Sequence, residues 1–427
     1  MATQYLNQSY AEEKLVFRAL TATYMIYFLG ALYVTGSIIG WMLLSIIVVR
    51  LYVLGRHKQF ALPVLIWVWV LSMLVMLVVL WIGHADWNLG TGKTIKSSIG
   101  WAKGWALFAV FIVVGAIAEI KVSTIVRGVC MLSSHTLIFA IITLIASIAR
   151  IPGEIYISPL QMVGGPGPNF FTVSLYGMNP ETGAARWQFF GPWSPAAGLL
   201  ACLFFVICNA EREFKWRILG IIGCFTMVLL SQSRAGLVIF IALIPMMYFS
   251  DQVREPWFLI SAGIIIAALL TLGQPIFEAF QDFHQQIKDQ RPESTRVRNT
   301  LERLAMQRWQ SEAFWFGHGI VEPGSKIVKG MPIGTHHSWY GLLFVKGLLG
   351  LLALLVPMCL TLVYLFWQAI YYPVARIAFN LLFVLVCYSF FENLEILTYL
   401  FWPALLIIGV ALNPLKVGGN HGLRANI

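Results

Sequence analysis

Runs of about 17 or more apolar residues recur along almost the whole chain, and this pattern limits what it can fold into more than any other feature. A helix of about 20 apolar residues crosses the roughly 30 Å of hydrocarbon in a bilayer while satisfying its own backbone hydrogen bonds. The chain is 59% hydrophobic and 11% charged, with a mean hydropathy of +0.77. Because a soluble domain carries about 25% charged residues, the sequence predicts an all-α integral membrane protein.

The apolar runs divide the chain into about twelve expected membrane spans. Positive residues gather in alternate short connections, such as those at Arg50, Arg212 and Arg376. The positive-inside rule places these connections and both termini in the cytoplasm. No basic leader with a short apolar stretch and a cleavage site opens the sequence, so we expect no cleaved signal peptide. The expected spans are 16–35, 37–55, 60–82, 103–120, 124–148, 193–209, 216–231, 235–249, 256–273, 339–367, 375–391 and 394–412.

Three longer segments are predicted on the outer side of the membrane: 83–102, 149–192 and 274–338. The first contains Lys93 and Lys96, with Lys103 at its edge, which goes against the positive-inside rule.

The segment 274–338 is too long for a simple connection and is expected to fold as a helical lid. Its helix is predicted in "STRVRNTLERLAMQRWQSEAFWF", with Pro292 before it. The chain then divides into nine spans with two smaller outer loops (1–273), the lid (274–338), and three further spans with a cytoplasmic tail (339–427).

The net charge of +10 does not indicate a nucleic-acid partner, because much of it lies in short loops where positive charge sets orientation. No cofactor or metal site is predicted. The cysteines all fall inside apolar runs without metal-ligand spacing, and we interpret them as small core residues. They are Cys130, Cys202, Cys208, Cys224, Cys359 and Cys387.

Arginine is concentrated in the expected lid, and guanidinium groups match the oxygens of phosphate and pyrophosphate. A charge-assisted hydrogen bond of this kind contributes about 1.5–3 kcal/mol. The alternative is a solvated helix whose arginines pair with Glu293, Glu302 and Glu312. The arginines are Arg291, Arg296, Arg298, Arg303 and Arg308.

Two further arginines precede spans on the predicted outer side. Arg234, in "SQSRAGLVIF", occupies a very short connection, and an arginine at span depth costs about 2.5–3.5 kcal/mol on insertion scales. Arg186 opens "ARWQFFGPWSPAAGLL", where aromatic residues and a Gly-Pro break lead into a span. Either side chain could bind an anionic ligand or snorkel to lipid headgroups.

His336 and His337 stand in "THHSWYGLLFVKGLLG", directly before a long apolar run. A neutral imidazole there can accept a proton from a hydroxyl near pH 7, and Ser338 could cap the helix that follows. The alternative is a pair of interfacial histidines that hydrogen-bond to backbone or water. Metal ligation is not expected, because adjacent histidines point in different directions on a helix.

Together these stretches resemble the O-antigen ligase and polymerase superfamily of bacterial envelope enzymes. "THHSWYGLLFVKGLLG" is similar to its histidine, spacer and Gly-x-x-Gly pattern, "SQSRAGLV" to its Ser-Arg-Gly element, and "RWQFFGPWSPAAG" to its Arg, Gly, Pro stretch. "TRVRNTLERLAMQRW" and "WFGHG" match its large outer loop. The motif resemblance covers roughly residues 185 to 350.

The resemblance implies a metal-independent, inverting glycosyltransferase with a GT-C-like fold, in the bacterial inner membrane with its active site facing the periplasm. Its donor would be an O-antigen glycan on undecaprenyl pyrophosphate and its acceptor a lipid A-core sugar, with membrane lipids around it. The resemblance assigns the base to His337 or His336, and the pyrophosphate contacts to Arg186, Arg234 and Arg298, with weaker support for Arg296 and Arg303.

Two departures from the family pattern stand out. The spacing to Gly347 and Gly350 fits His336 better, although Ser338 follows His337 as the family's polar residue would. The acidic residue often found before the first glycine is Lys346 here.

The motifs leave other functions open. An O-antigen polymerase or a protein O-oligosaccharyltransferase of the same superfamily would share them and differ in the acceptor. A transporter or flippase of lipid-linked sugars is a more distant alternative, which would require ionisable residues within the spans.

Overall fold

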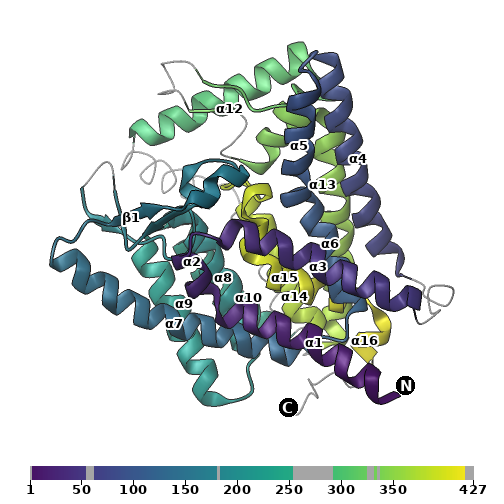
Figure 1. Ribbon diagram of the computed structural model, residues 1–427, viewed down its shortest axis with the longest axis vertical. Coiled ribbons are helices and arrows are strands. Elements are labelled where there is room, and N and C mark those ends of the chain that lie inside the picture. The colour runs from purple at the N-terminus through teal and green to yellow at the C-terminus, as the bar shows by residue number, and fades with distance from the viewer. Residues whose placement is uncertain are drawn as a thin grey trace, which may run out of the picture.

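The computed structural model describes residues 2–53, 62–179, 183–252, 292–324, 331–333 and 337–418. These residues are mostly helical (Figure 1). The helices are α1 (Ala2–Thr21), α2 (Thr23–Phe28), α3 (Leu32–Val53), α4 (Val64–Asp86), α5 (Thr91–Lys103), α6 (Trp105–Ile117), α7 (Val122–Ile148), α8 (Ser194–Asn209), α9 (Phe214–Ser231), α10 (Arg234–Gln252), α12 (Pro292–Glu312), α13 (Ser338–Tyr371), α14 (Pro373–Ser389), α15 (Thr398–Ala411) and α16 (Pro414–Gly418).

Within these ranges, six helices are long and apolar enough to cross a membrane: Leu32–Val53, Val64–Asp86, Thr91–Ile117, Val122–Ile148, Phe214–Ser231 and Ser338–Tyr371. Shorter apolar helices are Ser194–Asn209, Arg234–Ser250, Pro373–Ser389 and Glu395–Ala411. The prediction of a helical, multi-pass membrane protein is confirmed. The expected number of twelve spans is not confirmed. The expected span 256–273 lies outside the described residues.

The centre of the bundle is formed by α6 and α15, which are buried along nearly their whole length. The two backbones touch at glycines: a Cβ on Gly115 would overlap the carbonyl of Leu406, and a Cβ on Gly409 would overlap the carbonyl of Ile112. Small residues of this kind let apolar helices approach closely. Stacked rings of Phe111 and Trp402, with centroids 5.6 Å apart, fill the space beside this contact.

The expected span 16–35 is wrong as a single helix. The chain forms α1, α2 and the start of α3 instead, with a break between Phe28 and Leu32. Gly30 adopts a φ of +60°, which glycine reaches without strain, and it packs against the side chain of Ser158. Ser158 also donates a hydrogen bond to the carbonyl of Leu29 (3.1 Å). A loop far along the chain therefore stabilises the break.

The segment 149–192, which the sequence placed on the outer side, contains strands that were not predicted. β1 (Glu154–Ile157) pairs antiparallel with β2 (Thr172–Ser174), and β3 (Gly177–Met178) pairs antiparallel with β4 (Ala185–Arg186). Short 3-10 turns, η2 (Pro159–Val163) and η3 (Pro168–Phe170), lie between β1 and β2. These strands are too short for alternating hydrophobicity to identify them.

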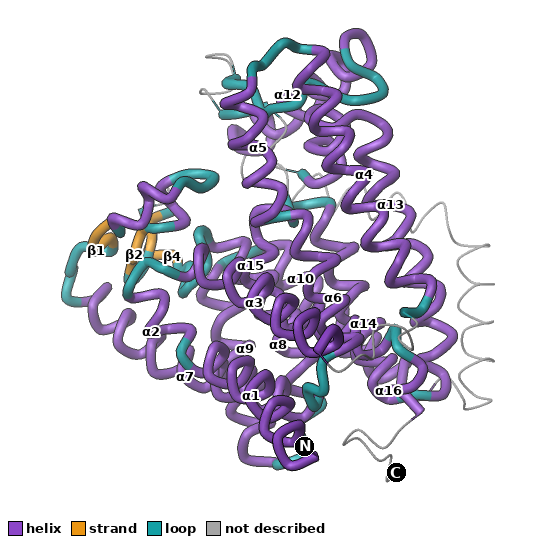
Figure 2. Tube along the Cα trace, turned by 45° about the vertical axis from the view of Figure 1, so that its right-hand side comes forward, coloured by secondary structure: helices purple, strands orange, loops and turns teal. Residues whose placement is uncertain are grey.

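The lid helix is confirmed: α12 begins at Pro292 and ends at Glu312. Its apolar residues Val297, Leu301 and Ala305 pack with Phe344 of α13 and with Ile333. The helix crosses one end of the bundle, beside the column that α4, α5 and α13 form (Figures 1 and 2). Residues 274–291 of the expected lid lie outside the described residues.

Candidate functional site

α8 and α13 begin, and α14 ends, at the same end of the bundle. We call this end of the bundle the α13 start. The indole of Trp193, which precedes α8, donates to the Glu392 carboxylate (2.9 Å) in the turn after α14. The hydroxyl of Ser338, the first residue of α13, donates to the Glu392 carbonyl (2.6 Å). The indole of Trp339 donates to the hydroxyl of Ser389 (2.8 Å). These bonds join the motif regions before α8 and α13, which lie far apart in sequence.

Arg186 is attached to the turn that leads into Arg234. Its Nε donates to the carbonyl of Ser231 (2.9 Å) and its Nη2 to the carbonyl of Gln232 (3.4 Å). The Gln232 side chain donates in return to the carbonyl of Ala185 (3.1 Å). Gln232 ends α9 in the left-handed region, so α10 can start two residues later with Arg234. The two arginines that the sequence singled out therefore come from one compact unit of β4 and the α9–α10 turn.

His337 is the N-cap of α13. Its Nδ1 accepts hydrogen bonds from the backbone N–H groups of Trp339 (3.1 Å) and Tyr340 (3.4 Å). The ring packs against Tyr340 and Phe390, with centroids 4.6 and 6.0 Å away. Burial lowers the pKa of His337 to about 4, so the imidazole is neutral at pH 7.

The cap determines which nitrogen of His337 carries the proton. A neutral imidazole has one protonated nitrogen, and an Nδ1 that accepts leaves the proton on Nε2. A general base must instead offer an unprotonated nitrogen to its substrate. In this conformation His337 stabilises the helix start, and it can act as a base only after the cap is released or the tautomer changes. His336 lies outside the described residues.

The predicted lid arginines Arg296, Arg298 and Arg303 all belong to α12. Arg296 and Arg303 are exposed, on a face turned away from the contact with Phe344. The apolar residues Leu301 and Ala305 form the side that packs on α13.

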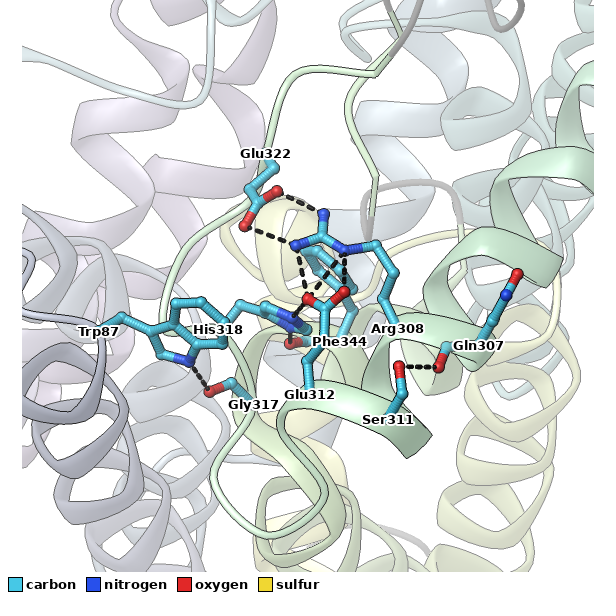
Figure 3. Close-up of polar contacts among 9 residues, drawn as sticks. All are labelled: Trp87, Gln307, Arg308, Ser311, Glu312, Gly317, His318, Glu322 and Phe344. Atoms are coloured by element: carbon cyan, nitrogen blue, oxygen red, sulfur yellow. Dashed lines mark hydrogen bonds and ion pairs between the residues drawn. The ribbon is translucent and has the colours of Figure 1, made fainter.

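Arg308 takes part in a different structure, a network of charged side chains beside α13 (Figure 3). Its guanidinium contacts Glu312 (2.8 Å) and Glu322 (2.5 Å), and it lies 5.3 Å from the centroid of the Phe344 ring. The Arg308 and His318 side chains hold the pKa of Glu312 down to about 2. For Arg308, the expectation that lid arginines pair with lid glutamates is confirmed.

His318 completes this network and was not predicted as a site residue, although "WFGHG" was part of the resemblance. Only 1% of its surface is exposed. The ring is stacked between Trp87 and Phe344, with centroids 4.9 and 4.2 Å away. Its Nδ1 lies 3.0 Å from the Phe344 carbonyl and its Nε2 2.9 Å from the Glu312 carboxylate. Both partners are oxygen acceptors, and they hold the ring from its two nitrogen sides.

The loop that carries His318 is inserted into a break in α13. Gly347 has non-helical angles (φ 62°, ψ −164°), which interrupts the helix's own hydrogen bonds. The freed carbonyls of Phe344 and Val345 accept from the backbone N–H groups of His318 (2.8 Å) and Gly319 (2.9 Å). In return, Leu348 N–H donates to the Phe314 carbonyl (2.9 Å) and Leu349 N–H to the Trp315 carbonyl (3.3 Å). We call this set of four bonds the α13 interlock.

Glycines make the α13 interlock possible. A Cβ on Gly347 would overlap the carbonyl of Trp315, and a Cβ on Gly317 would overlap the backbone at Lys346. Gly350 in turn leaves room for the Lys346 side chain, which is 3% exposed. The Gly-x-x-Gly pattern at 347–350 thus serves helix breakage and packing, and it attaches the lid to the helix whose first turn holds His337.

Glu392 is the second residue that sequence reasoning missed. It is a buried carboxylate at the α13 start, bonded to Trp193 and, through its carbonyl, to Ser338. The available signal was an acidic residue in "FFENLEI", between two apolar runs. Besides the histidines, Glu392 is a further group at this end that could accept a proton.

Among the residues that the structure describes, no three His, Cys, Asp or Glu side chains are grouped to hold a metal ion. A comparison of the chain with protein-family models finds no match, and a comparison with curated proteins finds none either. The assignment of a function therefore depends on the residues themselves.

Proposed function

We propose that this protein is an O-antigen ligase, which transfers O-antigen polysaccharide from undecaprenyl pyrophosphate to a hydroxyl of a lipid A-core sugar. The observation that carries the proposal is the attachment of Arg186, on β4, to the α9–α10 turn that leads into Arg234. In this proposal the site faces the periplasm and the protein lies in the bacterial inner membrane. It acts in lipopolysaccharide biosynthesis.

The proposed reaction is a single displacement at the anomeric carbon of the glycan. The acceptor oxygen forms the new glycosidic bond while the bond to the pyrophosphate oxygen breaks, and undecaprenyl pyrophosphate leaves with the electron pair. The acceptor proton passes to a base, His337 or His336. Guanidinium groups at Arg186, Arg234 and Arg298 stabilise the negative charge of the leaving group, as fixed cations do in a dry site. One displacement inverts the configuration of that carbon.

The lid supports this assignment. α12 carries Arg296, Arg298 and Arg303, and the α13 interlock attaches the chain after α12 to the helix that begins directly after His337. Binding of a charged donor against α12 would therefore act on α13 through Phe344 and the interlock. Positioning of this kind supplies a large share of catalysis in transfer reactions.

One observation favours a different class of function. Lys346 is a buried lysine inside α13, and ionisable residues within spans are typical of transporters. A transporter or flippase of lipid-linked sugars is therefore the second candidate. An O-antigen polymerase and a protein O-oligosaccharyltransferase would use the same residues with another acceptor.

The test uses purified protein in lipid nanodiscs with undecaprenyl-pyrophosphate glycan and rough lipopolysaccharide. We expect a ladder of higher-mass lipopolysaccharide that forms in the presence of a chelator. Arg186→Ala and Arg234→Ala should reduce use of the donor, whereas Arg217→Ala, at the other end of α9, should not. If free glycan polymer forms without modified lipopolysaccharide, the protein is a polymerase and not a ligase. Loss of product on chelation would refute the metal-independent mechanism. Movement of donor across vesicles without transfer would favour the transporter.

A further inference from the structure

α5 carries the three lysines that go against the positive-inside rule, and the structure shows why they are available. The helix is attached to α4 by one side only. Trp81 of α4 donates to the hydroxyl of Ser98 (2.9 Å), the hydroxyl of Ser97 lies 3.0 Å from Nε2 of His84, and Trp101 donates to the Met73 carbonyl (2.9 Å). Figures 1 and 2 both show α5 beside α4, on the side toward the β1–β2 sheet.

The opposite side of α5 is open and combines positive and apolar side chains. Lys93 and Lys96 are exposed, and Ile95 and Ile99 between and beyond them are 62% and 50% exposed. α5 contains no acidic residue. Among the residues that the structure describes, neither lysine forms an ion pair. We call these four residues the α5 face.

The depth of the α5 face matches the edge of a bilayer. The bond from Trp81 to Ser98 places it beside the second half of α4, where Val78 and Trp81 are exposed as lipid-facing residues are. Tryptophans at this level are typical of the membrane interface, and long lysines there extend to headgroup phosphates. A face of this composition fits a molecule that has both a phosphate and an acyl chain.

The end of α5 is joined to the α13 start by a row of aromatic rings. Lys103 donates to the Gly164 carbonyl (3.3 Å) and lies 5.8 Å from the centroid of the Tyr33 ring. Tyr33 contacts Phe170 (centroids 5.4 Å apart), and Phe170 contacts Trp193 (5.6 Å), the residue bonded to Glu392. Packed side chains therefore connect the C-terminal end of α5 with the candidate site.

We propose that the α5 face binds the phosphate-bearing lipid part of the acceptor, with phosphate on Lys93 and Lys96 and an acyl chain along Ile95 and Ile99. This inference rests on the proposed function, because it identifies the lipid with the acceptor. Free inorganic phosphate would contact the two lysines but not the two isoleucines, so binding of a lipid and binding of free phosphate can be told apart.

The experiment measures binding of rough lipopolysaccharide to the full-length protein in nanodiscs made of zwitterionic lipid. The test variant is Lys93→Gln/Lys96→Gln, and the matched control is Lys121→Gln/Lys215→Gln, two exposed lysines outside α5. We expect the test variant to bind about tenfold more weakly and the control to bind as the native protein does. Ile95→Ser/Ile99→Ser should also weaken binding.

In the transfer assay the test variant should raise KM for the acceptor while kcat and the KM for the donor stay the same. Equal binding by the test variant and the native protein would overturn the proposal, as would full competition by inorganic phosphate or equal binding of phosphatidylglycerol. If the binding difference is found but no transfer occurs with any acceptor, the lipid site stands and the proposed function fails.

Discussion

Replacing His337 in two ways separates its role as a helix cap from its proposed role as a base. Asparagine is a good N-cap residue and can accept the backbone N–H groups of Trp339 and Tyr340 as the imidazole does. It cannot take up a proton at neutral pH. Alanine can do neither. The pair His337→Asn and His337→Ala therefore differs in the cap alone, and both differ from the native protein in proton transfer.

The structure gives the size of each effect. Loss of the cap in His337→Ala should lower stability by about 1 kcal/mol, while His337→Asn should change it by only a few tenths. Loss of a general base typically reduces the rate by about 10²–10⁴-fold, so both variants should lose most of their transfer activity. His337→Ala and His337→Asn would then differ in stability but be similar in transfer activity.

The lowered pKa of His337 adds a dependence on pH. Burial reduces this pKa from 6.5 to about 4, so the folded protein binds the proton less tightly than the unfolded chain. The stability that the neutral ring contributes is present above about pH 6.5 and is lost as pH falls toward 4. At pH 5.5 the loss amounts to at most roughly 1.4 kcal/mol, because one pKa unit corresponds to about 1.4 kcal/mol. His337→Asn should not show this part of the loss.

Thermal unfolding in detergent at pH 7.5 and 5.5, combined with single-turnover transfer from the glycan donor, measures both properties. Lowering the pH should reduce Tm more for the native protein than for His337→Asn. Near-native transfer by His337→Asn would refute the base assignment, leave His337 as a cap, and direct attention to His336 and Glu392. Equal Tm values for the Asn and Ala variants would refute the cap.

Three further outcomes are expected. Gly347→Ala should destabilise the protein by more than about 2 kcal/mol, because φ at this position is positive and a Cβ would overlap Trp315. Thermal unfolding measures this as a lower Tm, and an unchanged Tm would contradict the interlock. Glu312→Gln should lower stability by less than about 1 kcal/mol, seen as a slightly lower Tm, because the carboxylate is partly exposed. It should also increase hydrogen exchange at the Gly319 N–H, and exchange at the native rate would show that Glu312 does not hold the loop. Arg186→Lys should raise KM for the donor about tenfold, because an ammonium lacks the fork that reaches both carbonyls of the α9–α10 turn; an unchanged KM would exclude Arg186 from donor binding.

The fold class was predictable because a membrane span is a long feature with a strong compositional signal. The start of α12 at Pro292 was predictable for a local reason, since proline is favoured in the first turn of a helix. The break between α1 and α3 was not, because it depends on Ser158 from a loop more than one hundred residues away. Hydropathy measures the length of an apolar run and does not detect a turn inside it.

The candidate site was predictable in its parts and not in its connections. Arg186 and Arg234 stood out because positive charge is disfavoured in short outer loops, and the structure joins them through the carbonyls of Ser231 and Gln232. His337 stood out as a titratable residue, but its cap geometry fixes a tautomer that no sequence pattern reveals. His318 and Glu392 were missed because a single polar residue between apolar runs carries little signal until its partners are known.

The α13 interlock limits how the lid can move. The end of α12 nearest His318 is fixed by main-chain hydrogen bonds in both directions, so a large displacement there would have to unfold part of a membrane helix. The Pro292 end has no such restraint among the described residues, and any rotation of α12 must therefore pivot about its C-terminal turn. A crosslink that fixes the Pro292 end should therefore restrict the motion of α12 more than a crosslink at Glu312, where the interlock already holds the chain.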